Sequence, residues 1–300
     1  MIHSRVRLGS LFSKPYTSCS RAWPIASRWK PLRELPSGEL ATFRREAFAP
    51  AQPTLLPRGQ FFGLPAIQKW FMRPRDNSVE TSFNLNYLSG YGSAIVPLEF
   101  TRLRPTISAE EAQDSFQRAE APFQIFLDWT RHTTMKTTER LYLAQASFAN
   151  LPAALTEDLP TPEIVTKAGT GDIYDTNIWL GIPPTYTPLH RDPNPNLFVQ
   201  LAGHKIVRVL PPDAGDRVFA RVQSALGKAG SASFRGEEMM KGKEKKMLEF
   251  EVWDNVNDEA NEGFEAHMWD GDGLFIPKGW WHSIKGVDGG VLGSVNWWFR

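Results

Sequence analysis

The sequence of 300 residues predicts a mainly β domain of the sandwich or barrel type. Its second half contains many short runs of β-branched and aromatic residues separated by Pro- and Gly-rich turns, which is the pattern of such folds. Hydrophobic residues make up 41% of the chain, with 11 Trp and 19 Phe, so a sizeable core can form. No apolar stretch in the sequence reaches the length of a membrane-spanning helix.

The first 33 residues differ in composition from the rest of the chain. They hold seven Lys or Arg residues, no Asp or Glu, and many Ser and Thr residues. This composition is typical of organelle transit peptides, so we expect a mitochondrial transit peptide at 1–33. The alternative is a basic tail that stays attached to a cytoplasmic or nuclear protein. The chain has 34 basic and 33 acidic residues. Without the seven basic residues at 1–33, 27 basic and 33 acidic residues remain, so the net charge is −6, which disfavours general nucleic-acid binding.

Cysteine is almost absent from the chain. Cys19 is the single cysteine, and it lies in the predicted transit peptide. The rest of the chain therefore cannot form an internal disulfide, a cysteine-ligated zinc site or an iron–sulfur site. Any metal ion must be bound by His and carboxylate side chains.

Residues 34–122 are predicted to form an N-terminal extension that packs on the main domain. Its expected elements are a short helix or strand at 43–48, strands at 82–88 and 94–100, and a helix at 109–119. The two strands flank a Gly-Tyr-Gly turn. The helix begins with a capping box formed by Ser108 and Glu111, and Pro122 ends the helical pattern.

Residues 123–300 are predicted to form the main β domain. Strands are expected at 124–129, 141–144, 176–180, 198–201, 205–210, 273–276 and 291–299. The fourth and fifth of these are predicted to pair as a hairpin around Ala202-Gly203-His204. The stretch 213–263 interrupts the β pattern with a helix at 217–226 and a polar, Gly- and Lys-rich segment. We expect either a surface insertion or a lid over a functional site.

His190 and Asp192 are the central chemical feature of the sequence. Residues i and i+2 on an extended strand point to the same side, so both side chains can reach one metal ion. His282 is the best candidate for a third ligand. Two His and one carboxylate leave open metal positions for a co-substrate and dioxygen, an arrangement of non-haem iron(II) oxygenases. His-X-Asp alone is a weak motif, and the alternative is a hydrogen-bonded surface His190.

The other candidate ligands are His204 and His267. His204 is expected in the loop of the predicted hairpin, and His267 has no second ligand type two residues away. We expect each of them to be structural or exposed.

The surroundings of His190 and His282 resemble the Jumonji-C family of the cupin superfamily. Four features carry the resemblance: Leu141-Tyr142-Leu143-Ala144-Gln145, Thr187-Pro188-Leu189-His190-Arg191-Asp192-Pro193-Asn194-Pro195-Asn196, Lys205 fifteen residues after His190, and Gly271-Asp272-Gly273-Leu274-Phe275-Ile276-Pro277-Lys278-Gly279-Trp280-Trp281-His282. The clear match spans about 138–300, with weaker similarity back to about residue 40. It is closest to protein hydroxylases such as the asparaginyl hydroxylase that inhibits hypoxia-inducible factor.

The resemblance implies a double-stranded β-helix (jelly-roll) core with N-terminal helical and strand decoration. It implies that iron(II) binds His190, Asp192 and His282, and that 2-oxoglutarate and O2 are co-substrates. It also implies a co-substrate site formed by the charge of Lys205, the hydroxyls of Thr187 and Tyr142, and the nearby amides of Asn196 and Asn296. Alternatively, Asn196 caps a turn and Asn296 is an ordinary core amide. Trp179, Trp281 and Trp298 are expected to be core or wall aromatics without a catalytic role.

Lys205, Val207 and Val209 are two residues apart, so on one strand their side chains point to the same face, and the two Val residues suit a barrel interior. A Lys side chain there is costly without an anionic partner, and the alternative is that it extends outward to solvent. Thr187 and His190 differ by three positions, so a regular strand would place them on opposite faces. Pro188 between them predicts an irregular segment that lets both reach the site.

The reaction implied by the resemblance is hydroxylation of a protein side chain, with succinate and CO2 as co-products. The alternatives are lysine demethylation, a non-catalytic cupin-like binding module, and a metal-dependent cupin that acts on a small molecule without 2-oxoglutarate. A protein substrate of unknown identity is expected. No membrane or nucleic-acid partner is expected, and the oligomeric state is open.

Overall fold

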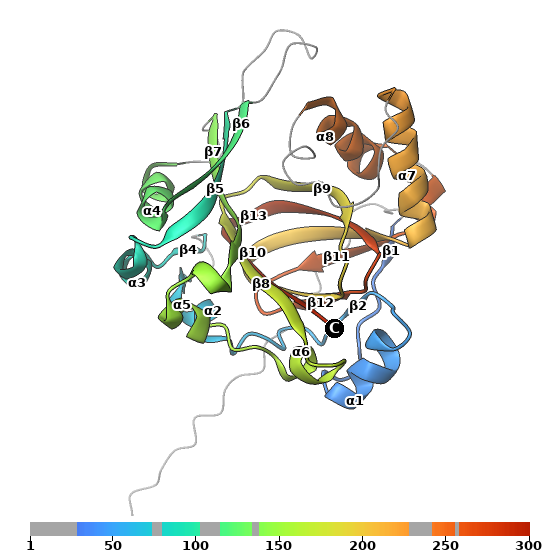
Figure 1. The fold of residues 1–300 in the computed structure, drawn as a ribbon, viewed down its shortest axis with the longest axis horizontal. Coiled ribbons are helices and arrows are strands. Elements are labelled where there is room, and N and C mark those ends of the chain that lie inside the picture. The colour runs from blue at the N-terminus through green and yellow to red at the C-terminus, as the bar shows by residue number, and fades with distance from the viewer. Residues whose placement is uncertain (1–28, 74–79, 103–114, 134–137, 228–241, 256–257) are drawn as a thin grey trace, which may run out of the picture.

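The computed structural model describes residues 29–73, 80–102, 115–133, 138–227, 242–255 and 258–300. Within this part of the chain, eleven strands form one large curled sheet, and the helices lie outside it (Figure 1). The prediction of a mainly β jelly-roll core with N-terminal decoration is confirmed. No helix among the described residues is both long enough and apolar enough to cross a membrane.

Most strands belong to the large sheet, and β3 and β4 form a separate pair. The strands are β1 (Lys30–Pro31), β2 (Thr54–Leu55), β3 (Phe71–Met72), β4 (Ser82–Phe83), β5 (Ile95–Arg102), β6 (Ser115–Pro122), β7 (Glu139–Ser147), β8 (Ile173–Gly181), β9 (Thr185–Arg191), β10 (Asn196–Leu210), β11 (Phe264–Met268), β12 (Gly273–Ile276) and β13 (Trp281–Phe299).

The helices are short and decorate the outside of the sheet. They are α1 (Leu40–Phe43), η1 (Arg44–Phe48), α2 (Pro65–Lys69), α3 (Leu85–Leu88), η2 (Ser89–Tyr91), α4 (Phe123–His132), η3 (Phe148–Asn150), α5 (Ala153–Glu157), α6 (Glu163–Lys167), α7 (Pro212–Ala225), α8 (Gly242–Glu249), η5 (Phe250–Asp254) and η6 (Asp258–Asn261).

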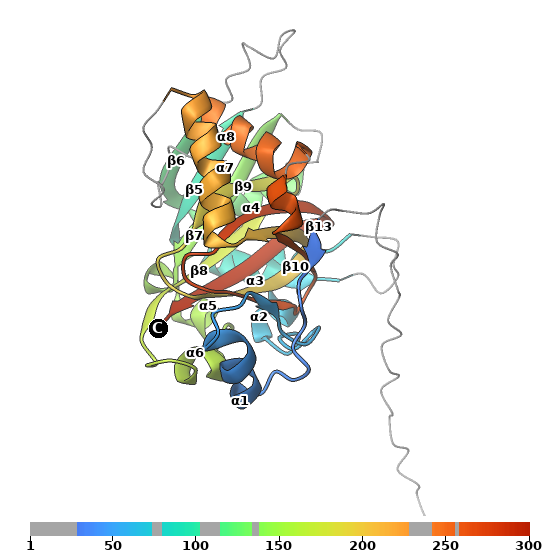
Figure 2. The same ribbon diagram turned by 90° about the vertical axis from the view of Figure 1, so that its right-hand side faces the viewer.

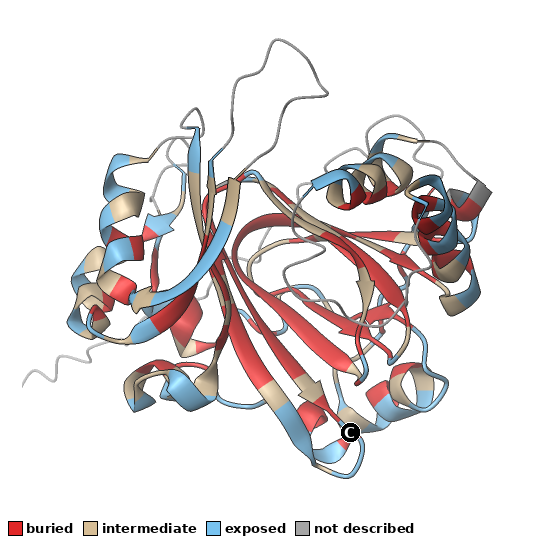
Figure 3. Cartoon of the chain, turned by 45° about the horizontal axis from the view of Figure 1, so that its top comes forward, coloured by how far each residue is buried: buried red, intermediate tan, exposed pale blue. Residues whose placement is uncertain are grey.

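Two long strands, β10 and β13, form the spine of the sheet. They pair antiparallel along most of their length, from Asn196 opposite Trp298 to Leu210 opposite Trp281. The first part of β13 also pairs with β9, which sets His282 directly opposite His190. Figure 3 shows that these central strands are mostly buried while the surrounding helices face solvent. Residues far apart in the sequence are thereby held together by rigid strands.

The N-terminal segment closes one end of the sheet with aromatic contacts. Phe43 meets Phe275 of β12 edge-on at 5.0 Å between ring centroids, and Phe48 stacks on Phe299 of β13 at 5.7 Å. Aromatic pairs at these separations contribute beyond the area that they bury. Phe43 and Phe48 therefore pack on the barrel, and β5 and β6, from the same N-terminal part of the chain, are strands of the large sheet.

Residues Trp29 to Arg33, which the sequence placed at the end of the leader, belong to the folded body. Trp29 is buried, and β1 pairs parallel with β11. Residues 1–28 lie outside the described part of the chain, so the transit peptide stays a prediction.

The predicted hairpin around Gly203 is wrong, because β10 runs unbroken from Asn196 to Leu210. Gly203 has φ +75°, and the pairing with β13 shifts register on both sides of His204. The glycine therefore serves a bulge within one strand rather than a turn between two strands. As a result His204 is buried in a strand and not exposed in a loop.

Two predictions near residue 120 are also wrong. The expected strand at 124–129 is part of helix α4, whose buried Phe123, Phe126 and Leu127 recur at helical spacing. The expected helix at 109–119 lies partly outside the described residues, and its described end belongs to β6, which pairs with β5. At 115–119, cross-strand pairing thus prevails over the helix that the local sequence predicts.

The strand expected at 82–88 is wrong beyond Phe83. The side chain of Asn84 accepts a hydrogen bond from the Tyr87 backbone N–H and caps α3. Asn is a favoured N-cap residue, because its side chain satisfies a backbone donor that the first helical turn leaves unpaired.

The stretch at 213–263 lies between β10 and β11 in the chain. Its described helices α7, α8 and η5 pack on the outer face of β9 and β13, where Leu189 and Trp281 join their apolar cluster. Figure 2 shows α7 and α8 side by side on this outer face. The described part of the insertion therefore supports these strands from behind and does not cover the interior.

Candidate metal centre

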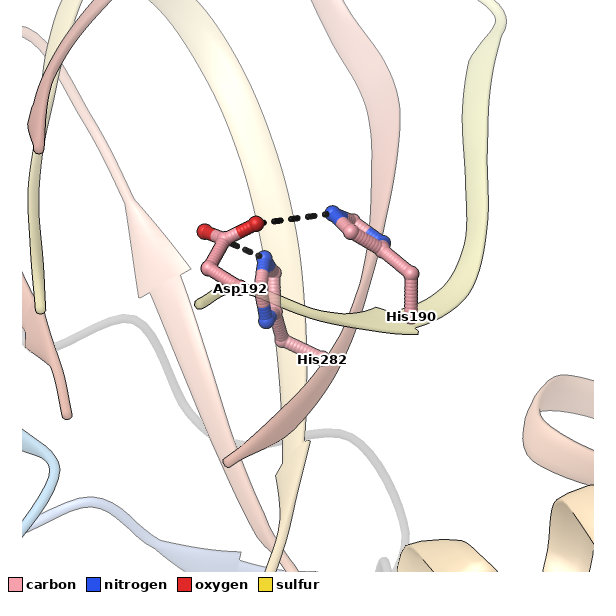
Figure 4. A group of neighbouring side chains, drawn as sticks. All are labelled: His190, Asp192 and His282. Atoms are coloured by element: carbon pink, nitrogen blue, oxygen red, sulfur yellow. Dashed lines mark ion pairs between the residues drawn. The ribbon is translucent and has the colours of Figure 1, made fainter. Parts of the chain in front are cut away.

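His190, Asp192 and His282 converge on one point inside the barrel (Figure 4). One potential ligand atom from each lies within 4.8 Å of the other two. His190 Nε2 is 3.9 Å from one carboxylate oxygen of Asp192, and His282 Nε2 is 3.6 Å from the other. Within the described chain no other group of His, Cys, Asp and Glu side chains meets this criterion.

The backbone orients both imidazole rings. His190 Nδ1 lies 2.8 Å from the carbonyl oxygen of Pro188, and His282 Nδ1 lies 3.3 Å from that of Trp280. A carbonyl accepts only, so each Nδ1 carries the hydrogen, and the lone pair of each Nε2 faces the Asp192 carboxylate. Fixing the tautomer of a metal-binding His through its other nitrogen is typical of metal sites.

Asp192 and His282 have the protonation states that a metal ion needs. Burial, together with the neighbouring His190, lowers the pKa of His282 to about 4, although Asp192 opposes the shift. Burial alone would raise the pKa of Asp192, but the two imidazoles and two N–H donors offset this, and its pKa lies below the usual range. At neutral pH the site therefore offers a neutral imidazole at His282 and a carboxylate at Asp192.

A chain of hydrogen bonds holds the Asp192 carboxylate. Asn196 Nδ2 and Trp298 Nε1 both donate to Oδ2 of Asp192, at 3.0 and 2.8 Å. Asn296 Nδ2 in turn donates to Oδ1 of Asn196 at 2.9 Å. Trp298, to which the sequence gave no role, thus orients a potential ligand. The Asn196 amide serves the carboxylate and does not merely cap a turn.

Lys205 is buried in the same interior with a relative exposure of 3%. Its Nζ donates to Ser294 Oγ at 2.8 Å and lies 5.4 Å from the centre of the Phe198 ring. In the described chain no carboxylate forms an ion pair with it. Burial lowers the pKa of Lys205 to about 7. The alternative that the Lys205 side chain extends outward to solvent is wrong. Its buried amine lines the pocket, where an anionic ligand can pair with it.

One pocket contains all eight predicted site residues. It has about 360 Å³ of space, part of it open to solvent. Its walls are Tyr142, Trp179, Thr187, His190, Asp192, Asn196, Phe198, Lys205, His282, Ile284, Ser294, Asn296 and Trp298. Sequence reasoning missed Ser294, although its position two residues before Asn296 on β13 places it on the same face.

Thr187 and His190 reach this pocket together because β9 is irregular. His190 lies opposite His282 and Thr187 lies opposite Ile284, so Pro188 and Leu189 of β9 face the single residue Ser283 of β13. The extra residue in β9 is a bulge, which changes the alternation of side chains. The irregularity predicted from Pro188 is present.

The donor set fits a divalent transition metal that tolerates open coordination positions. Imidazole with carboxylate suits iron(II), and three protein ligands on one face leave room for a bidentate acid and dioxygen. The buried amine of Lys205, 2.8 Å from a hydroxyl, fits the far carboxylate of such an acid. Tyr142 stays a neutral hydroxyl donor, because burial and then the nearby Glu99 raise its pKa.

Comparison with known proteins gives the same picture. Residues 18–300 match a family described as the cupin-like domain. The Arabidopsis thaliana protein named lysine-specific demethylase JMJ30 is 24% identical over 87% of this chain and 52% of its own length. The Drosophila melanogaster Jumonji C domain-containing protein 5 is 26% identical over 89% of this chain and 59% of its length.

A third relative, the Danio rerio protein named lysine-specific demethylase 8, is 22% identical over 96% of this chain and 63% of its own length. The chain thus spans between about half and two thirds of the length of these relatives.

Proposed function

The chain belongs to the cupin-like domain family with its Jumonji-C relatives, and from this premise we propose an iron(II)- and 2-oxoglutarate-dependent oxygenase that acts on a C–H bond of a protein side chain. One observation carries the proposal: the His190–Asp192–His282 group and the buried amine of Lys205 share a single pocket. A metal-binding group alone would fit many cupins. The lysine adds a site for a second, anionic component.

In this proposal each described side chain has a defined task. His190, Asp192 and His282 hold iron(II), while Trp298 and Asn196 keep the Asp192 carboxylate in place. Lys205 binds the far carboxylate of 2-oxoglutarate, with hydroxyls from Ser294, Thr187 and Tyr142 around it. When bound, iron(II) with 2-oxoglutarate and dioxygen supplies the oxidation, which yields succinate and carbon dioxide and puts one oxygen atom into a substrate C–H bond.

The names of the relatives favour N-methyl-lysine as the substrate over the stable side-chain hydroxylation that the sequence resemblance implied. Two of the three relatives above are named lysine-specific demethylases. Oxygen inserted into an N-methyl C–H bond gives an unstable hemiaminal that releases formaldehyde, so one oxygenase site supports both outcomes. We therefore propose demethylation first and stable hydroxylation second.

The test is turnover of 2-oxoglutarate by the purified chain in air. With added iron(II) and matched peptides carrying unmethylated, mono-, di- or trimethylated lysine, we expect succinate formation that a chelator abolishes. Formaldehyde in equal amount to succinate identifies demethylation, while a peptide that gains one oxygen atom identifies hydroxylation. A folded chain that neither binds nor consumes 2-oxoglutarate in the presence of iron(II) contradicts the oxygenase proposal.

A further inference from the structure

The outer side of the strands that carry the metal ligands faces the insertion at 213–263. Leu189 of β9 and Trp281 of β13 lie next to His190 and His282 in the sequence and pack among residues of α7, α8 and η5. Trp281 meets Phe219 of α7 with ring centroids 5.3 Å apart. Arg191, between His190 and Asp192, pairs with Asp216 of α7 at 3.2 Å. Each potential metal ligand thus has a neighbour that contacts the insertion.

The bulge of β9 decides how Thr187 and His190 lie relative to one another. Thr187 and His190 both line the pocket only because the extra residue of β9 lies between them. Pro188, inside the bulge, has no N–H to donate to the strand ladder. The relative position of the Thr187 hydroxyl and the His190 ring therefore depends on whatever else fixes the backbone at this point.

A relay of two hydrogen bonds provides that fixation. Ser283, which lies between His282 and Ile284 and is fully buried, donates from Oγ to the carbonyl oxygen of Thr187 at 2.8 Å. Trp253 of η5 donates from Nε1 to Ser283 Oγ at 2.9 Å. The relay thus leads from the insertion, through the residue next to a metal ligand, to the backbone at the start of the bulge.

Trp253 is itself held by charged groups. The guanidinium of Arg208 lies 4.4 Å from the centre of its ring, and Lys285 Nζ lies 5.0 Å from it. Lys285 also pairs with Glu249 of α8 at 2.7 Å, and Arg208 donates to the carbonyl oxygen of Val252 at 2.7 Å. Cations over an indole face stabilise it, so the donor of the relay has a defined place.

We propose that Trp253 is a positioning residue which, through Ser283, fixes the bulge of β9 and thereby sets the affinity of the pocket for 2-oxoglutarate. The inference rests on the proposed function, because it assigns Thr187 to the co-substrate. It gives the insertion a role in the reaction although none of its described side chains lines the pocket. A purely structural helix pair would contribute stability and leave co-substrate affinity unchanged.

The experiment measures 2-oxoglutarate binding to manganese(II)-loaded protein by calorimetry under nitrogen, where no turnover occurs. Trp253→Phe removes the indole donor, and Ser283→Ala removes the hydroxyl without adding volume. Partners that orient a metal site are worth about 10–100-fold, so we expect roughly 10-fold weaker binding for each. Trp70→Phe is the matched control, because it removes an indole N–H bond from Trp70 in the N-terminal segment to Asp158 after α5. We expect it to bind 2-oxoglutarate like the wild type.

Two further measurements separate positioning from general damage. In turnover, the KM for 2-oxoglutarate is expected to rise about 10-fold in both variants with little change in kcat. The double variant is expected to bind no more weakly than Ser283→Ala alone, because both changes break one relay. Additive losses, or wild-type affinity in a folded Ser283→Ala variant, overturn the inference. A wild-type chain that does not bind 2-oxoglutarate overturns the proposed function itself.

Discussion

Two groups of histidine and carboxylate side chains lie on the large sheet, one inside the barrel and one outside, and β13 contributes a residue to each. The inner group is His190, Asp192 and His282, whose ligand atoms surround one point. The outer group is a line: His204 contacts Asp288 through Nδ1 and His267 through Nε2, both at 3.1 Å. His267 continues the line to Glu265 at 3.3 Å.

The difference lies in what each ring nitrogen faces. In the inner group, the Nδ1 atom of each His donates a hydrogen bond to a backbone carbonyl oxygen, and the two Nε2 lone pairs can bind a shared ion. In the outer group both nitrogens of His204 are turned toward different neighbours. Residue type alone therefore does not make a metal site, because the direction of the lone pairs decides.

The largest effect is expected from removing an inner ligand. His190→Ala or Asp192→Ala leaves two protein ligands for the metal ion. Loss of a group that only orients a ligand costs up to roughly 100-fold. We therefore expect loss of a ligand to lower iron-dependent succinate formation by more than that. The measurement is the rate of succinate formation at saturating 2-oxoglutarate. His204→Asn, the matched change in the outer group, is expected to stay within a few-fold of wild type. Equal losses in both groups would remove the distinction between them.

A second contrast concerns the two cations of β10, of which Lys205 is buried and Arg208 is partly buried. Arg208, on the outer side, pairs with Glu265 at 2.8 Å, whereas Lys205, inside, has a hydroxyl partner. Lys205→Ala removes a charge-assisted hydrogen bond worth about 1.5–3 kcal/mol, so 2-oxoglutarate binding is expected to weaken roughly 10- to 150-fold. Calorimetry with the manganese(II)-loaded protein measures it. Unchanged 2-oxoglutarate affinity in this variant would assign the lysine another task.

The same lysine predicts a pH dependence. Because burial lowers its pKa to about 7 and a bound carboxylate favours the charged amine, 2-oxoglutarate binding above pH 7 requires proton uptake. The affinity of the protein for 2-oxoglutarate is expected to fall by up to about 10-fold per pH unit above pH 7 and to be nearly constant below pH 7. Without ligand, stability is expected to rise with pH between about 7 and the ordinary value of 10.5, since the unfolded chain binds more protons there. Lys205→Ala removes both trends.

A smaller effect is expected from the donors that hold Asp192. Trp298→Phe keeps the ring and removes one of two N–H bonds to the carboxylate, so metal affinity is expected to fall about 10-fold. Titration with manganese(II) measures this change. Trp269→Phe is the control from the outer group, where the indole stacks on His204 at 3.7 Å between ring centroids. Full metal affinity in the Trp298→Phe variant would show that Asn196 alone suffices.

His190, Asp192 and Lys205 were predictable from the sequence because the information is local, whereas the distant His282 was assigned through the motif that resembles the Jumonji-C family. His190 and Asp192 are two residues apart, each imidazole bonds to a carbonyl two residues before it, and the inward parity of Lys205 follows from Val207 and Val209. The outer line was not predictable. It depends on a bulge at Gly203 that sets His204 opposite Asp288, and a glycine between two apolar runs is equally typical of a hairpin.

Contacts between side chains of different elements could not be predicted from the sequence either. The contact of Trp253 with Ser283 joins residues 30 apart through an insertion whose helices pack by tertiary contacts. The strand expected at 124–129 failed for a related reason, since its apolar residues fit either period until the packing surface is known.

The smallest effect on turnover is expected from His267→Gln in the outer line. Gln cannot reproduce both ring contacts, so a buried nitrogen of His204 loses its partner, at a cost of about 1–3 kcal/mol. Denaturant unfolding measures this loss of stability, while metal and 2-oxoglutarate affinities are expected to stay at wild-type values. Because Lys205 follows His204 directly in β10, a fall in 2-oxoglutarate affinity in this variant would mean that the outer line also positions the inner cation. The two groups would then have to be treated as one site.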